Sequence, residues 1–88
     1  MNSKEYFYTY ILYDKSCSRY YCGSTNNLKR RIKQHNDPEY KGSLTTKRFK
    51  GPWELVWKQE FNSRSDAMAL EKVIKKRGIG RYLEKAAQ

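Results

Sequence analysis

The sequence contains few of the residues that build disulfide-rich, zinc-binding or membrane-spanning proteins. Two cysteines and one histidine among 88 residues are too few for a disulfide framework or a structural zinc site with four ligands. Cys17 and Cys22 are therefore expected to be reduced thiols, as in a cytoplasmic protein. The first residues lack the features of a secretory signal, and the longest apolar and aromatic run, residues 6–13, is too short to cross a bilayer. We expect a cytoplasmic protein with no membrane-spanning segment.

Negative charge is also scarce. Nine acidic residues stand against 19 Lys and Arg, which gives a formal net charge of +10. This surplus favours a polyanionic partner, with nucleic acid ahead of an anionic membrane surface. Aromatic residues make up 15% of the chain, which argues against a disordered basic tail. Binding to a membrane surface would require a helix with a broad apolar face, and we find none.

The chain is expected to form one domain, residues 1–88, since single folds of this size are common. Residues 6–13 and 19–23 are rich in β-branched and aromatic residues and flank a polar turn, which predicts an antiparallel hairpin. A helix over residues 28–35 follows several candidate N-cap residues. Residues 53–61 alternate apolar with polar side chains, except at Val56, and predict a third strand.

The C-terminal part of the chain predicts two further helices. Ser63 and Asp66 have the spacing of a capping box and precede a helix that runs to about Arg77. Two glycines then separate it from a short helix near residues 81–87. The fold class is therefore α+β: a small three-stranded antiparallel sheet covered by helices, in the order ββαβα plus a short C-terminal helix. Residues 36–52 show no periodicity, and a loop of that length usually carries function or is disordered.

One face of the helix at residues 28–35 combines apolar and charged residues. Leu28 and Ile32 form its apolar stripe, and Arg31 and His35 fall on the same stripe. An inward-facing Arg requires an anion or a hydrogen-bond network; otherwise it extends its charged end to the surface or forms a structural ion pair. The opposite face carries the other cations, Lys29, Arg30 and Lys33.

Glu71 and the tyrosines have comparable alternatives. Glu71 borders the apolar face of its helix, where it could be an ion-pair partner of Arg31 or a metal ligand. Tyr10 and Tyr21 lie on the first two strands, where tyrosines usually contribute to packing.

Two triplets and three single residues occur in order along the chain: Tyr8-Thr9-Tyr10, Tyr21-Cys22-Gly23, Arg31, His35 and Glu71. Their types and spacing resemble the GIY-YIG endonuclease superfamily, which includes DNA-repair nucleases, and within it the small stand-alone bacterial members. Tyr21 follows Tyr10 by 11 positions, Arg31 follows Tyr21 by 10, and His35 follows Arg31 by 4. The resemblance extends from residue 6 through the helix that carries Glu71.

The chain also departs from the pattern of that family. Tyr8 and Thr9 replace the leading Gly and middle Ile of the first triplet, and Cys22 stands where Ile or Val is usual. Family members often have an Asn late in the domain, whereas no Asn follows Asn62. Despite these departures, the chain keeps the tyrosines, Arg31, His35 and Glu71, which the chemistry implied by the resemblance requires.

The resemblance implies an endonuclease that hydrolyses phosphodiester bonds in DNA with one divalent metal ion, Mg²⁺ or Mn²⁺, bound by Glu71. The scattered carboxylates agree with one ion, because two-metal sites need clustered acids. By the same resemblance, Tyr10 or Tyr21 is the base that activates water. A phenol has a pKa near 10, so it needs nearby cations such as Arg31, the metal or a charged His35. Arg31 would hold phosphate oxygens, and His35 would orient a tyrosine hydroxyl or contact the phosphate.

A cation surplus surrounds these residues and is expected to contact the nucleic-acid backbone without reading its sequence. The predicted contacts are Lys29, Arg30, Lys33, Lys47 and Arg48. Any specificity would then come from a partner protein, which the sequence does not identify. The alternative function is a non-catalytic nucleic-acid-binding module that retains the nuclease fold.

Overall fold

The computed structural model describes residues 5–37, 39–40 and 52–86. These residues form a three-stranded antiparallel sheet and three helices, which confirms the predicted α+β class and the order ββαβα with a C-terminal helix. In chain order the elements are β1 (Phe7–Asp14), β2 (Arg19–Thr25), α1 (Leu28–Asn36), β3 (Trp53–Phe61), α3 (Arg64–Arg77) and α4 (Ile79–Ala86). Among the described residues, no helix has both the length and the apolar character that a membrane span requires.

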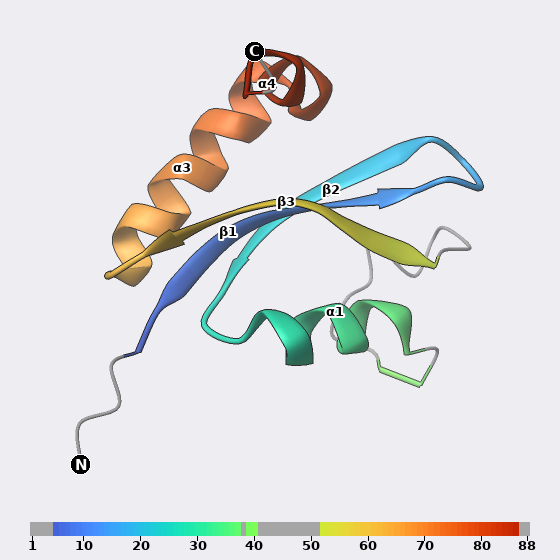
Figure 1. Ribbon diagram of the computed structural model, residues 1–88, viewed down its shortest axis with the longest axis horizontal. Coiled ribbons are helices and arrows are strands. Elements are labelled where there is room, and N and C mark those ends of the chain that lie inside the picture. Colours follow the sequence, from blue (N-terminus) through green and yellow to red (C-terminus); the bar gives the residue numbers. More distant parts are fainter. Residues whose placement is uncertain (1–4, 38, 41–51, 87–88) are drawn as a thin grey trace.

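The sheet is covered on both faces (Figure 1). Its strand order is β2-β1-β3, with α1 on one face and α3 and α4 on the other. Because β1 is central and covered on both sides, consecutive side chains of β1 enter different cores. Tyr10 and Leu12 pack with Trp53 on the α1 side, and Ile11 packs with Ile74 on the α3 side. The side chains of Tyr10, Ile11, Leu12 and Ile74 are fully buried.

A β-bulge in β3 reverses the faces that simple alternation predicts. Ile11 pairs with Trp57, but Leu12 pairs with Leu55, which leaves Val56 as an extra residue. In a regular strand Trp53 and Trp57, four residues apart, would share a face; here Trp53 lies in the α1-side core and Trp57 on the α4 side. The one break in the alternation of the sequence, at Val56, is the position of the bulge.

Polar side chains cap the N-termini of α1 and α3. The Asn27 side chain accepts a hydrogen bond from the Arg30 backbone N–H (3.0 Å) and caps α1. The Ser63 hydroxyl accepts one from the Asp66 backbone N–H (3.2 Å) and caps α3, as predicted.

Two predicted boundaries are corrected. β2 extends to Thr25 because Ser24 and Thr25 pair with β1. The last helix begins at Ile79, since Gly78 alone, at a φ of 100°, ends α3. Gly80 therefore lies inside α4 rather than before it.

Asn36 joins the end of α1 to the start of β3. Its side-chain oxygen accepts from the Trp53 N–H (2.7 Å) and its amide donates to the Trp53 carbonyl (3.1 Å). This clamp holds the first residue of β3 against the helix that carries Arg31 and His35.

Asn36→Ala should lower the free energy of unfolding by about 1–2 kcal/mol, because it removes two partly buried hydrogen bonds. Asn36→Asp keeps the acceptor for the Trp53 N–H but sets a second oxygen against the Trp53 carbonyl, so an intermediate or similar loss is expected. Urea denaturation of the three proteins measures both effects. Unchanged midpoints would show that the clamp contributes nothing to stability.

Candidate active site

Tyr10, Tyr21 and His35 form a cluster beneath α1. The Tyr10 side chain is fully buried, and its hydroxyl shares a hydrogen bond of 2.9 Å with Nε2 of His35. The Tyr21 ring centroid lies 4.8 Å from that of His35 and 6.3 Å from that of Tyr10. The hairpin register explains this proximity, because Tyr10 is opposite Gly23 and Tyr21 is opposite Leu12 on the same face of the sheet. Three residues named from the sequence are therefore neighbours.

Gly23 is required by this arrangement for steric reasons. A Cβ atom at this position would lie 2.7 Å from the Tyr10 hydroxyl oxygen and 3.0 Å from the Tyr21 ring. The first distance is shorter than real Cβ contacts, so any larger residue would push the Tyr10 phenol away from His35. The glycine of the second triplet thus leaves the space that the Tyr10 ring occupies.

Arg31 lies half-buried one helical turn before His35, as the helical spacing predicts. Its guanidinium donates to Oε1 of Gln34 (3.1 Å) and to the hydroxyl of Tyr40 (3.4 Å). Burial of the Arg31 guanidinium lowers its pKa, but the interactions with neighbouring tyrosines outweigh burial, so the pKa of Arg31 is raised. These interactions are a hydrogen bond to Tyr10 and the charge of the Tyr10 phenolate, followed by a hydrogen bond to Tyr40 and the charge of Tyr21. The contact between Tyr40 and Arg31 was not predicted, because Tyr40 lies in a segment without periodicity, and such a segment does not indicate where its side chains point.

Glu71 approaches from the other face of the sheet. Its carboxylate accepts from Nζ of Lys75 at 2.6 Å, one turn later in α3. Among the described residues, Glu71 forms an ion pair with Lys75 and none with Arg31. The predicted alternative, an Arg31–Glu71 pair, is therefore not formed. The physical reason is that the sheet separates α1 from α3 (Figure 1).

Glu71 nevertheless lies within electrostatic range of the tyrosine cluster. Burial is the main cause of the raised pKa values of Tyr10 and Cys22, and the charge of Glu71 adds to both. The carboxylate and the phenol are therefore close enough to interact electrostatically, although the Tyr10 side chain lies on the α1 side of the sheet and Glu71 on the α3 side. β2, an edge strand, carries both Tyr21 and Cys22.

The ionisation of Tyr10 differs from the expectation for a catalytic base. Burial, followed by the nearby Tyr21, raises the pKa of Tyr10, and Arg31 offsets only part of that rise. We had expected neighbouring cations to lower the pKa of whichever tyrosine is the base. For Tyr10 the cost of burying a phenolate outweighs the cation, so its hydroxyl stays protonated at neutral pH.

The predicted phosphate-contacting cations are only partly described. Lys29, Arg30 and Lys33 are exposed on α1, on the side away from the sheet. Lys47 and Arg48 lie outside the described residues, so their contribution stays a prediction.

The donor set near the cluster suits at most one hard cation. Among the described residues there is no group of three or more His, Cys, Asp or Glu side chains that could hold a metal. Glu71 offers one carboxylate whose side chain is 20% exposed. Mg²⁺ keeps several waters and needs only one or two protein carboxylates, so the residues present fit a single ion. The ammonium of Lys75 now pairs with this carboxylate and would compete for it.

Stability at alkaline pH should depend on the Tyr10 hydroxyl. In the unfolded chain a tyrosine ionises near its ordinary pKa of 10.0, whereas in the folded protein Tyr10 stays protonated above that pH. Its contribution is therefore complete below pH 10 and is lost as the pH rises further. Cys22 acts with the same sign, since burial raises its pKa from 9.0 to about 12.

Tyr10→Phe should accordingly lose less stability than the wild type as the pH rises from about 10 to about 12. Urea midpoints at several pH values measure this difference, and Tyr20→Phe, which removes an exposed hydroxyl, is the matched control. If the wild type and Tyr10→Phe lose stability in parallel, the buried phenol does not titrate as described.

Comparison with known proteins supplies the family. The family model described as the GIY-YIG catalytic domain matches residues 6–78. A UPF0213 protein of Limosilactobacillus reuteri is 39% identical over 70 residues, which cover 78% of this chain and 70% of the relative. UPF0213 protein YazA of Bacillus subtilis is 36% identical over 74 residues, which cover 84% and 69%. UPF0213 protein CPE1444 of Clostridium perfringens is 44% identical over 69 residues, which cover 78% and 70%.

A solved structure agrees with this assignment. The solution NMR structure of the UPF0213 protein BH0048 from Bacillus halodurans matches with a TM-score of 0.55 and 30% identity, over 93% of this chain and 83% of that one. The family match includes both tyrosine triplets, Arg31, His35 and Glu71. The chain therefore belongs to the GIY-YIG family, a superfamily of nucleases.

Proposed function

We propose that this protein is a metal-dependent endonuclease that hydrolyses phosphodiester bonds in DNA. The observation that carries the proposal is the state of Arg31. Its guanidinium is half-buried, its hydrogen-bond partners are an amide and tyrosine hydroxyls (Gln34, Tyr40 and Tyr10), and no carboxylate pairs with it among the described residues. A partly desolvated cation without an anion is costly, so this position is suited to bind an anionic group of a substrate.

Arg31 would bind the phosphate at the scissile bond. The planar guanidinium has five N–H donors, and Gln34 and Tyr40 are both bonded through one of its terminal nitrogens. The remaining donors can hold two phosphate oxygens side by side. A charge fixed in advance at this position stabilises the additional negative charge that develops on the phosphate during water attack.

The two tyrosines would have different roles. Tyr10 is fully buried and protonated, and its hydroxyl holds His35 in place, so we assign it to positioning. Tyr21 is only half-buried, lies on an edge strand and packs against the His35 ring. We therefore assign Tyr21, in its deprotonated phenolate form, as the group that takes the proton from the attacking water and becomes the neutral phenol. His35, fixed by Tyr10, would then set the orientation of the Tyr21 ring.

GIY-YIG nucleases are generally dependent on a divalent metal. In this chain Glu71 would hold one ion, Mg²⁺ or Mn²⁺, in exchange for its contact with Lys75. When bound, such an ion supplies positive charge next to the phosphate oxygens. The hydrogen bond from Lys75 to Glu71 is the main cause of the raised pKa of Lys75, and the charge of the Tyr21 phenolate adds to this rise. The Glu71–Lys75 pair is therefore close enough to Tyr21 for their charges to interact.

The cations on the outer face of α1 would hold the nucleic-acid backbone. Lys29, Arg30 and Lys33 are exposed beside the site, and Lys47 and Arg48 add two charges from the segment that follows. Such contacts neutralise phosphates without reading bases. Selection among target sequences would therefore depend on a partner protein or on the structure of the substrate.

Arg31→Ala should lower the single-turnover cleavage rate about 100- to 1,000-fold, as expected when a group that stabilises transition-state charge is removed. Lys33→Ala, on the exposed face of the same helix, should weaken DNA binding slightly and leave the chemical rate unchanged. Cleavage of labelled duplex, flap and single-stranded DNA with Mg²⁺ or Mn²⁺ measures the rates. A larger loss with Lys33→Ala would contradict the assignment. Wild-type protein that binds all of these substrates and cuts none would favour the non-catalytic alternative.

Glu71→Gln should abolish metal-dependent cleavage while the fold is kept. The Glu71–Lys75 pair is an i,i+4 pair at the surface, with the Lys75 side chain 52% and the Glu71 side chain 20% exposed, so its loss should cost no more than about 1 kcal/mol. Without the carboxylate charge, cleavage should fall by several orders of magnitude and DNA affinity should stay level or rise slightly.

Lys75→Gln is the matched control, because it breaks the same ion pair and keeps the carboxylate. This variant should still cleave and should need less Mg²⁺ for half-maximal rate, since a competing cation is gone. Thermal melting and single-turnover rates are measured on both variants. Equal losses of activity in the two variants would show that Glu71 acts through Lys75 and not as a metal ligand.

A further inference from the structure

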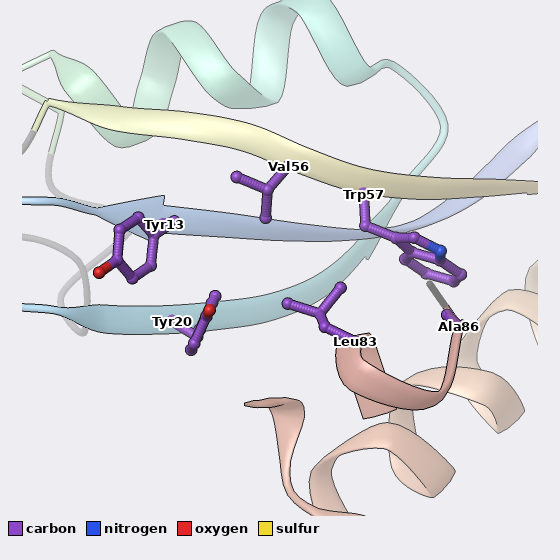
Figure 2. A pocket seen from close by; sticks show the side chains of 6 residues that line it. All are labelled: Tyr13, Tyr20, Val56, Trp57, Leu83 and Ala86. Carbon is purple, nitrogen blue, oxygen red and sulfur yellow. The ribbon is translucent and has the colours of Figure 1, made fainter. Parts of the chain in front are cut away.

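An apolar groove lies between the sheet and α4 (Figure 2), on the face of the sheet opposite α1 (Figure 1). All three strands and α4 contribute to its walls, and its volume is about 320 Å³. The residues that line it are Tyr13, Tyr20, Val56, Trp57, Leu83 and Ala86. We call this feature the aromatic groove.

The aromatic groove is lined by three aromatic rings, of which that of Tyr20 is exposed and those of Tyr13 and Trp57 are partly buried. The rings of Tyr13 and Tyr20 are in contact, with centroids 4.8 Å apart, and Tyr20 is 41% exposed. The Trp57 ring packs against the Tyr82 ring in an edge-to-face contact, with centroids 5.2 Å apart. Gly80 of α4 lies beside the Tyr20 ring, since a Cβ atom there would be in ordinary van der Waals contact with it at 3.9 Å. Exposed, preoriented aromatic faces are the surfaces on which unpaired bases stack.

The groove and the candidate active site meet at β2. Tyr20 and Tyr21 are consecutive residues of this strand, so their side chains point to opposite faces of the sheet. β2 is an edge strand and Tyr21 is only half-buried. A nucleic-acid strand that crosses this edge can therefore contact Tyr20 with a base and the Tyr21–Arg31 site with a neighbouring phosphate.

Charge favours a nucleic acid as the occupant. The chain has a formal net charge of +10, so a second copy at the groove would bring like charge against like. The hairpin and α4, which contribute to the groove, also carry four exposed cations, Lys15, Arg19, Arg81 and Lys85, against one exposed acid, Glu84. Apolar rings bordered by cations suit a ligand with flat bases and an anionic backbone.

We propose that the aromatic groove binds an unpaired nucleobase, and that the preferred substrate has a single-stranded segment that crosses β2 from the groove to the Arg31 site. The proposal rests on the proposed nuclease function and adds to it the class of substrate. Fully paired DNA keeps its bases stacked inside the duplex, so it would contact the cations of α1 and leave the groove empty.

Binding to two single strands of equal length tests this proposal, one with natural bases and one built of abasic sugars with the same phosphates. Measurements are made in EDTA, so that no strand is cut and the result does not depend on catalysis. Wild-type protein should bind the natural strand about 5- to 100-fold more tightly, the range expected for stacking one base on an aromatic side chain. Tyr20→Ala should remove most of this preference and leave affinity for the abasic strand unchanged. Tyr20→Trp should restore it.

Met68→Ala is the matched control, because Met68 is a similarly exposed apolar side chain, 46% exposed, on α3 outside the groove. Equal wild-type affinities for the two strands would overturn the proposal, as would equal losses for both strands in Tyr20→Ala. A change of oligomeric state in Tyr20→Ala, measured by light scattering, would instead assign the groove to a second copy. Failure of the nuclease proposal appears separately, as absence of cleavage with added metal while base-dependent binding persists.

Discussion

The hydrogen bond between the Tyr10 hydroxyl and Nε2 of His35, at 2.9 Å, joins the centre of the sheet to α1. It can form only because Gly23 lets the Tyr10 ring pass across β2. The same contact places His35 against the Tyr21 ring. Because Tyr10 is fully buried, these positions are set by the packed core and not by a mobile surface side chain. A site whose groups are held by core packing needs little rearrangement when substrate binds.

The sheet keeps the two charged groups of the site apart. Arg31 lies on the α1 side with neutral partners, and Glu71 lies on the α3 side with Lys75. Had the two helices shared a face, Arg31 and Glu71 could have neutralised one another. Because the sheet lies between them (Figure 1), Arg31 stays available for the proposed phosphate contact and Glu71 for the proposed metal ion. β2 is therefore the element around which a substrate would be arranged.

The bulge at Val56 connects this site with the opposite face. It rotates the start of β3 relative to its remainder, so that Trp53 packs near Tyr21 with ring centroids 6.5 Å apart. Trp57 meanwhile joins the wall of the aromatic groove. Without the extra residue, both tryptophans would point to one face. A single irregularity thus supplies an aromatic side chain to each of the two surfaces that meet at β2.

Local patterns in the sequence were sufficient for the elements and for the inward faces of the helices. Helical spacing placed Arg31 and His35 on the side of α1 that faces the sheet, and the Ser63 cap marked the start of α3. These features depend on neighbours a few residues away, so composition and periodicity carry them. The two tyrosine triplets indicated the family for the same reason.

Only the tertiary structure decided how separate elements combine. Periodicity states which side of its own helix Glu71 occupies, but not which face of the sheet that helix covers. The contact of Tyr40 with Arg31 and the raised pKa of Tyr10 likewise depend on residues distant in the chain and on the depth of burial. The aromatic groove brings three strands and α4 together. Such properties arise from long-range packing, which no local sequence window contains.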